Sequence, residues 1–95
     1  MTDFPVNEHG VPLYPKGHAG RLLVTMAAID TLNNPTATSV AALTGLNKGN
    51  IDRYVAALNN EMGVLIIKEG PRYRIESWGD LLKRNGVKKA LTGCI

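Results

Sequence analysis

The sequence predicts a small α+β domain that is mainly α-helical, with a three-helix core, a two-stranded hairpin and a C-terminal helix. Two observations lead to this class. Apolar residues recur at a helical period between Arg21 and Met62, and the pattern becomes extended after Gly63. The chain has 95 residues, of which 44% are hydrophobic, so one domain can bury an aliphatic core without disulfides or a metal.

Three segments are expected: an extended arm rich in proline and glycine over residues 1–18, the helices and hairpin over residues 19–76, and a C-terminal helix with a basic tail over residues 77–95. The arm holds three of the five prolines, at positions 5, 12 and 15, and proline disfavours helix at its own position and at the one before. The arm is also rich in apolar residues, which indicates that it lies along the domain or along a partner subunit.

The first helix is expected from Arg21 to Asn33. Its apolar residues fall on two opposite sides, with Leu22, Met26 and Ile29 on one and Val24 and Ala28 on the other. A helix that is apolar on two sides is expected to be buried on two sides, so this helix should be central. Pro35 prevents the helix from continuing.

A short helix, a tight turn and a longer helix are expected between Thr36 and Met62. Thr36 can cap the second helix, and Asn47 can cap the third, which ends before Gly63. Gly45 suits the left-handed turn between them. This spacing is typical of a helix-turn-helix.

The third helix is expected to have one buried face and one open face. Ile51, Val55, Leu58 and Met62 form a continuous apolar stripe at spacings of 4, 3 and 4. The opposite face consists of small residues and polar donors: Gly49, Arg53, Ala56 and Asn60, flanked by Asn50 and Ala57. Such a face lets the backbone approach DNA while arginine and asparagine reach base edges. The alternative is that another protein surface packs there.

After Gly63 the pattern predicts a hairpin, with strands at residues 64–67 and 72–75 and a turn at residues 69–71. Tyr73 and Ile75 should face the helices, so Arg72 and Arg74 should project together from the other face, near the turn. There they could rest on phosphates. The alternative is a hairpin that closes the core and carries ordinary solvated arginines.

The C-terminal helix is expected to begin at Ser77, because Ser77 and Asp80 resemble a capping box, and to stop at Asn85-Gly86. The following tail is too short to form a stable helix alone. It is expected either to dock Val87 and Leu91 on a partner subunit or to fray. Four basic residues here should form a solvated cluster, with added affinity for nucleic acid as the alternative: Lys83, Arg84, Lys88 and Lys89.

Composition limits the function. The net charge is +3, and all of this excess lies between Ser77 and Ile95, which permits a nucleic-acid partner without requiring one. The single cysteine, Cys94, can form no internal disulfide. No apolar run approaches the roughly 18 residues that span a bilayer, and the N-terminus lacks the features of a secretion signal, so a cytoplasmic protein is expected.

No catalytic group, metal site or cofactor is predicted, and an enzyme is not expected. The sequence has no glycine-rich phosphate loop, no paired carboxylates at a useful spacing and no cluster of cysteine and histidine. His9 and His18 stand apart from other metal ligands. Ser39 and Ser77 both look like residues at helix starts.

From Arg21 to Ile75 the order of elements resembles a winged helix-turn-helix, which would be the domain at residues 19–76. The segment from Val40 to Ile75 is similar to the N-terminal DNA-binding domain of IclR-type bacterial regulators. The resemblance rests on Ala41, the Thr44-Gly45-Leu46 corner, the Lys48–Arg53 helix start, Leu58, Met62-Gly63 and the Gly70–Tyr73 hairpin end. It implies groove contacts from the start of the third helix and backbone contacts from the hairpin, or wing.

Two departures from that family matter. IclR-type regulators carry a large ligand-sensing domain after the wing, whereas this chain ends about 20 residues after Ile75, so no small-molecule effector can be inferred. Gly49 also stands where the family usually has serine or threonine, which removes one hydroxyl contact.

The sequence therefore predicts a small sequence-specific transcriptional regulator, of plasmid or phage type, that binds double-stranded DNA as a homodimer. The expected DNA contacts are Lys48, Gly49, Asn50, Arg53, Asn60, Arg72 and Arg74. The alternative is a winged-helix adaptor that binds protein without reading DNA, which the near-neutral charge of the helix-turn-helix and wing favours. Insertion of the arm into the minor groove is disfavoured, because only Lys16 and His18 could meet phosphates.

Overall fold

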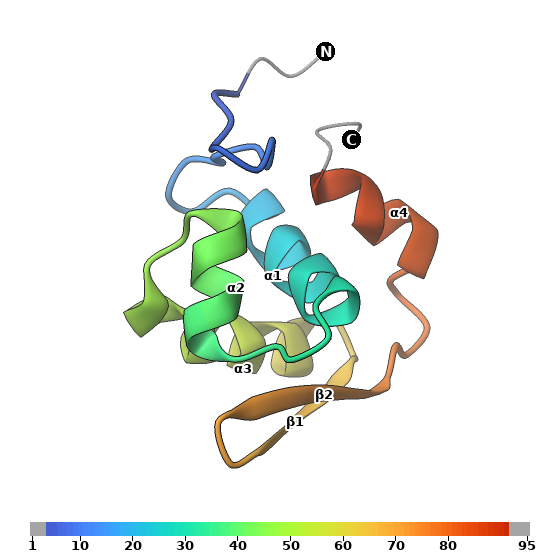
Figure 1. Ribbon diagram of the computed structural model, residues 1–95. Coiled ribbons are helices and arrows are strands. Elements are labelled where there is room, and N and C mark those ends of the chain that lie inside the picture. Colours follow the sequence, from blue (N-terminus) through green and yellow to red (C-terminus); the bar gives the residue numbers. More distant parts are fainter. Residues whose placement is uncertain (1–3, 92–95) are drawn as a thin grey trace.

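A computed structural model describes residues 4–91 (Figure 1). The predicted α+β class is confirmed, since this part of the chain has four α-helices and a two-stranded antiparallel hairpin. The elements, in which η denotes a 3₁₀ turn, are α1 Gly20–Thr31, α2 Ala37–Thr44, η1 Lys48–Asn50, α3 Ile51–Glu61, β1 Leu65–Glu69, β2 Arg72–Ser77, α4 Arg84–Lys88 and η2 Lys89–Leu91. Cys94 and the end of the tail lie outside the described residues.

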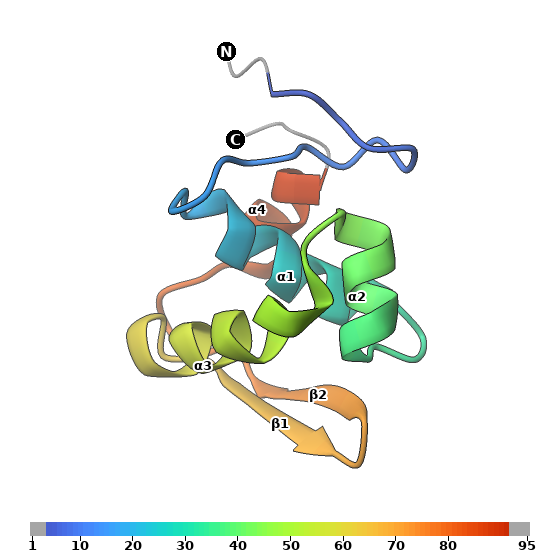
Figure 2. The same ribbon diagram turned by 90° about the vertical axis from the view of Figure 1, so that its left-hand side faces the viewer.

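Helix α1 is the centre of the fold, with α2, α3 and α4 around it (Figures 1 and 2). Met26 and Ile29 belong to the main core, which also contains residues of α2, α3 and the hairpin. Val24 belongs to a second cluster, with residues of the arm and Ala90. The predicted burial on two sides is therefore confirmed, because α1 separates two apolar clusters, but Ala28 lies in the main core and not with Val24 as expected.

The start of α2 has the predicted cap. Thr36 Oγ1 accepts a hydrogen bond from the Ser39 amide at 3.1 Å, and Ser39 Oγ accepts one from the Thr36 amide at 2.8 Å. Gly45 ends the helix with φ 77°, the left-handed conformation expected there. Asn47 caps η1, not α3 directly, since its Oδ1 accepts from the Gly49 amide at 2.8 Å, and α3 begins one turn later than expected.

The hairpin is attached to both ends of the helical pair. The amide of Tyr73 donates to the Pro35 carbonyl at 2.8 Å, which joins β2 to the loop between α1 and α2. The side chain of Asn59 in α3 bonds to both backbone groups of Ile66 in β1, at 2.8 and 3.1 Å. Tyr73 is only 1% exposed, so the hairpin closes the base of the core.

The prediction for the C-terminal helix was wrong in its position. Ser77 is the last residue of β2, where it pairs with Leu65, and its Oγ accepts from the Gly79 amide at 3.2 Å in a turn. Gly79 has φ 67°, and a Cβ there would lie 2.2 Å from the Gly63 carbonyl oxygen. The chain therefore turns against the end of α3 where a helix was expected.

The C-terminal helix was expected to stop at Asn85-Gly86, and the tail after it was not expected to form a stable helix alone. Instead the segment from Arg84 to Leu91 is helical, as α4 and η2. Val87 is 3% and Ala90 0% exposed, because both pack on this chain's own α1 and arm clusters. Docking on the domain supplies the stability that this short helix lacks alone.

The arm lies along the domain and contains no helix over residues 4–19. A small loop closes at the Val6–Pro12 bridge, and Asn7 Nδ2 donates to the Leu43 carbonyl at 2.8 Å. The buried Tyr14 hydroxyl donates to the Ala90 carbonyl at 2.9 Å. The arm therefore ties the two ends of the fold together.

Candidate nucleic-acid interface

Helix α3 has the two faces that the spacing predicts. Ile51 and Leu58 are 0% exposed and Val55 8%, as the predicted stripe requires, whereas Met62 at the end of the stripe is only partly buried. The opposite side is open to solvent: Gly49, Arg53, Ala56 and Asn60 are exposed, and Asn50 and Ala57 are half-buried. Small side chains on this side keep the helix backbone close to the surface, so a partner could approach it closely.

The start of α3 brings four of the expected contact residues together. Lys48 and Gly49 are exposed in η1, and Arg53 follows within one turn of α3. Asn50 is the N-cap residue of α3, but its side chain makes no capping hydrogen bond. This donor-rich stretch can therefore offer its polar side chains to a partner.

The cap of η1 explains why a glycine suits position 49. A Cβ at this position would lie 3.2 Å from Asn47 Oδ1, the atom that caps η1. A larger residue would crowd this cap, so glycine keeps the turn before α3 tight.

Asn60 is also exposed, but it lies at the other end of α3. It follows Arg53 by seven residues, which places it on the same side about 10.5 Å further along the axis. The structure therefore puts Asn60 in line with Arg53 but apart from the cluster at the helix start.

Tyr54 is a site residue that the sequence interpretation missed. It is 9% exposed, its hydroxyl accepts from Arg21 Nη1 at 3.0 Å, and Arg53 Cζ lies 5.6 Å from its ring centroid. Burial raises the pKa of the Tyr54 phenol, but the hydrogen bonds and charges of the two arginines outweigh this and lower it below its usual value. A signal was present, since Tyr54 lies three residues after Ile51 and four before Leu58.

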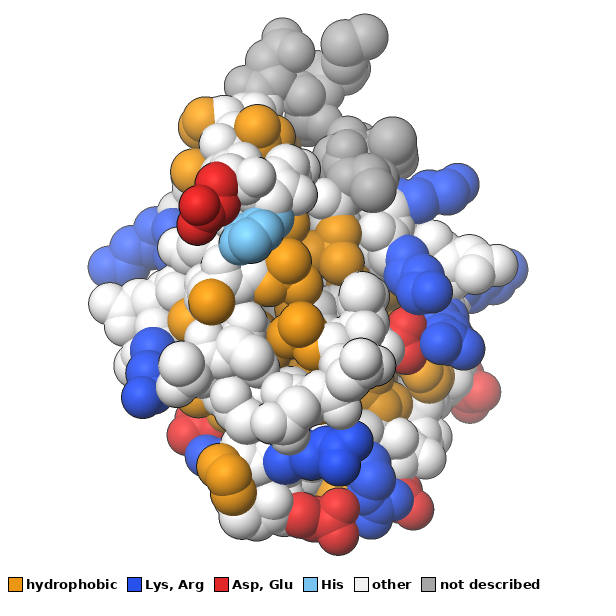
Figure 3. Space-filling view, in the orientation of Figure 1, with side chains coloured by type: hydrophobic (Ala, Val, Ile, Leu, Met, Phe, Trp, Pro, Cys, Tyr) orange, Lys and Arg blue, Asp and Glu red, His pale blue; other side chains and the backbone are white. Residues whose placement is uncertain are grey.

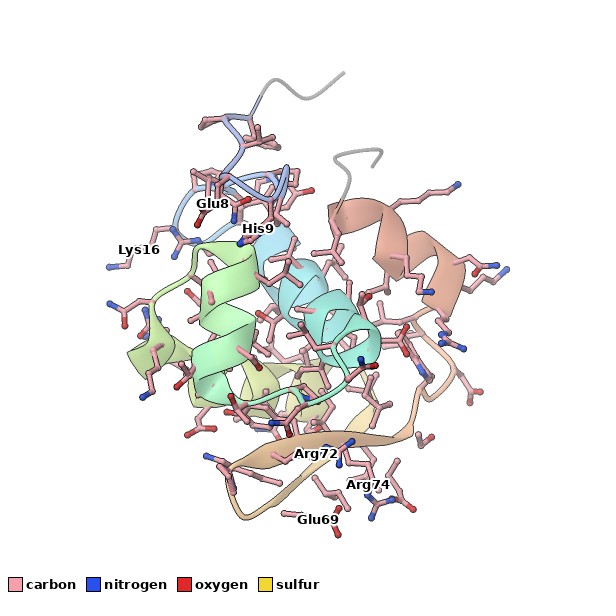
Figure 4. The ribbon with its side chains drawn as sticks, in the orientation of Figure 1. Glu8, His9, Lys16, Glu69, Arg72 and Arg74 are labelled. Atoms are coloured by element: carbon pink, nitrogen blue, oxygen red, sulfur yellow. The ribbon has the colours of Figure 1, made fainter. Side chains whose placement is uncertain are left out.

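The two hairpin arginines are exposed, as expected, but both have partners within the chain. Arg74 Nε donates to Glu69 at 2.9 Å, and its Nη1 donates to Glu76. Arg72 Nη2 donates to the Asn33 carbonyl at 3.1 Å. Figure 4 shows Arg74 beside Glu69 on the hairpin. The charge of Arg74 is thus opposed by two carboxylates, which weakens its attraction for phosphates.

A third basic side chain of the hairpin is also paired. Lys68 Nζ lies 3.3 Å from Asp52 in α3, and the Tyr73 hydroxyl donates to the same carboxylate. The hydrogen bond from Tyr73 has the largest effect and lowers the pKa of Asp52; burial raises it, and the contact with Lys68 lowers it further, so that the pKa lies below its usual value. These contacts fix the hairpin beside the first turn of α3.

The basic residues form separate groups. Figure 3 shows Lys and Arg side chains at the left edge, over the hairpin among acidic side chains, and over α4. Element η1 and helix α4 lie on opposite sides of the molecule in Figure 1. The C-terminal basic cluster is therefore remote from the start of α3, and Arg84 within it pairs with Asp30 at 3.0 Å.

Comparisons with known proteins add no assignment: the sequence matches no protein-family model, no curated protein and no solved structure. Among residues 4–91, no helix has both the length and the apolar character needed to cross a membrane. The same residues contain no group of three or more His, Cys, Asp or Glu side chains that could hold a metal ion.

Proposed function

We propose that the chain is a winged helix-turn-helix domain that regulates transcription by binding double-stranded DNA in a sequence-specific manner. In this proposal the start of α3 enters the major groove, and the β1–β2 hairpin is the wing that lies beside the phosphate backbone. The observation that carries the proposal is the start of α3, where the exposed Lys48, Gly49 and Arg53 and the half-buried Asn50 lie together beside a helix face with little side-chain bulk. Asp52 in the same stretch is held by the hairpin residues Lys68 and Tyr73.

The hairpin supports the same arrangement. Asp52 connects α3 to Lys68 and Tyr73 of the hairpin, so helix and wing form one rigid surface. Lys48 and Arg53 are expected to contribute most of the affinity, because Arg74 is neutralised within the wing and Arg72 is held by the loop after α1. A single domain of this size reads a short half-site, so we propose that two copies bind a palindromic site.

The test begins with selection of a preferred duplex from a random pool, followed by fluorescence anisotropy at several salt concentrations. Arg53→Ala is expected to weaken binding to the selected duplex by about 1–3 kcal/mol and to relax specificity at one position. Lys48→Gln should weaken binding to all sequences and lower the salt slope by about 0.9. Lys88→Gln, the same charge change on α4, is the control and should bind as the parent does.

The second candidate is a protein-interaction adaptor, and the intramolecular ion pairs favour it. Lys68, Arg74 and Arg84 each pair with a carboxylate, which leaves a weaker positive field than DNA-binding domains usually present. The two functions differ in non-specific binding. A DNA reader shows salt-dependent affinity for random duplex at low salt, whereas an adaptor shows none. Absence of that binding would reject the DNA proposal.

A further inference from the structure

A pocket of about 520 Å³ opens between the arm and α3. Its walls are the arm turn at residues 16–19, the first turn of α1 and one side of α3 from Arg53 to Met62. The volume lies within the range of about 300–1,000 Å³ that is typical of small-molecule sites. Arg53 lines this pocket as well as the open side of α3.

The charged and hydroxyl groups of the pocket are mostly hydrogen-bond donors. Lys16, Arg21 and Arg53 bring three positive charges against one carboxylate, that of Glu61. The Tyr54 oxygen accepts from Arg21, which leaves the phenol proton to be donated elsewhere. A ligand that satisfies these groups needs acceptors and a negative charge.

Arg21 is fixed before any ligand arrives. Its Nε donates to the Tyr14 carbonyl at 2.9 Å, and its Nη1 donates to the Tyr54 hydroxyl at 3.0 Å. The Arg53 guanidinium rests over the Tyr54 ring, 5.6 Å from its centroid. Guanidinium groups that are already ordered lose little side-chain entropy on binding and suit the geometry of a carboxylate.

The rest of the pocket is apolar, with Leu22, Ala57 and Met62 on its walls. We propose that this pocket binds an organic anion with an apolar body, of the chemical class of aromatic or aliphatic carboxylates, whose acid group meets the two arginines and the phenol. A free phosphate or a phosphodiester would satisfy the donors but leave the apolar wall in contact with water. The site goes beyond the proposed DNA binding and does not rest on it, because carboxylate binding is measured on the protein alone.

The probe pair is 2-naphthoate and its neutral amide, 2-naphthamide, which share one apolar body and differ in charge. Calorimetry on the full chain should show saturable binding of one naphthoate, with naphthamide weaker by about tenfold or more. Amide shifts in two-dimensional NMR should map to residues 16–22 and 53–62. Inorganic phosphate should compete poorly.

Two variants separate the contribution of charge to ligand binding from that of the apolar wall. Arg53→Gln should weaken naphthoate about tenfold and leave naphthamide nearly unchanged, whereas Ala57→Leu should weaken both because it fills the pocket. Lys88→Gln changes the charge equally outside the pocket and should have no effect. Equal affinity for naphthoate and naphthamide, shifts that map elsewhere, effective competition by phosphate, or no saturable binding would each overturn the proposal. None of these outcomes depends on whether the protein binds DNA.

Discussion

At the scale of single residues, two tyrosines have opposite electrostatic surroundings. Tyr73 is buried beside Asp52, and burial first, then the carboxylate, raises the pKa of its phenol. Tyr54 is buried beside Arg21 and Arg53, and these charges lower its pKa in spite of burial. The first hydroxyl therefore acts as a fixed structural donor within the fold, and the second lies in a cationic pocket suited to an anion.

Tyr73→Phe tests the structural hydrogen bond. The pKa of Asp52 in the folded protein lies below its ordinary value of 3.8, so the bond contributes stability above that pH and loses it as pH falls through the folded pKa. The variant should be less stable by about 1 kcal/mol at pH 7, a modest value because Asp52 is largely exposed. Urea unfolding between pH 7 and about 3 should show the difference shrinking as the solution becomes acidic.

Thr25→Val is the matched control. The buried Thr25 hydroxyl donates to the Arg21 carbonyl at 2.8 Å, and a carbonyl does not titrate, so loss of this bond should cost about the same at every pH in this range. A Tyr73→Phe difference that stays constant down to pH 3 would show that Asp52 gains nothing from the phenol.

At the scale of elements, local signals predicted the first three helices well and the C-terminal helix badly. The Thr36 cap, the turn at Gly45 and the stripe from Ile51 to Leu58 act within a few residues, so they are visible in the sequence. Ser77 has an equally good capping signal, but it does not begin a helix. A long-range interaction competes with helix capping there, since Ser77 pairs with Leu65 in the hairpin.

Helix α4 is the opposite case, because long-range contacts make a helix where the local sequence signals are weak. Its residues have weak local signals, with Gly86 in its middle, and its helix depends on burial of Val87 and Ala90 against α1 and the arm. These contacts join distant parts of the chain, so they could not be predicted from local periodicity.

Val87→Ala tests that dependence. Alanine is the better helix former, so an independent helix would gain stability, whereas a docked helix loses buried methyl groups. We expect a net loss of about 2 kcal/mol in the free energy of unfolding, together with faster amide exchange over residues 84–91. Lys88→Ala, at an exposed position of the same helix, should change stability by less than about 0.5 kcal/mol. Stability equal to or above the parent for Val87→Ala would contradict the docked arrangement.

At the scale of the whole molecule, the arm and α4 together cover the side of α1 that the helix pair leaves open. The aromatic contact of Phe4 with Tyr14, with ring centroids 4.8 Å apart, and the bond from Tyr14 to Ala90 connect the two ends of the chain. The open side of α3 followed from its buried stripe, so this part of the candidate site could be predicted. Two other parts depend on tertiary contacts and could not be predicted from the sequence. These are the partners of Arg72 and Arg74 and the position of the arm, which completes the pocket.

The two proposals meet at Arg53, which lies both at the start of the α3 face and in the pocket. If one guanidinium serves both partners, a carboxylate in the pocket should weaken DNA binding, and by linkage DNA should weaken carboxylate binding by the same factor. We expect a coupling of about 5-fold or more.

Anisotropy with the selected duplex would be measured at increasing 2-naphthoate, with ionic strength held constant and 2-naphthamide as the control. DNA affinity that is unchanged at saturating naphthoate would show that the two partners use separate groups. A loss that persists in Arg53→Gln would show that the coupling passes through another residue of the pocket.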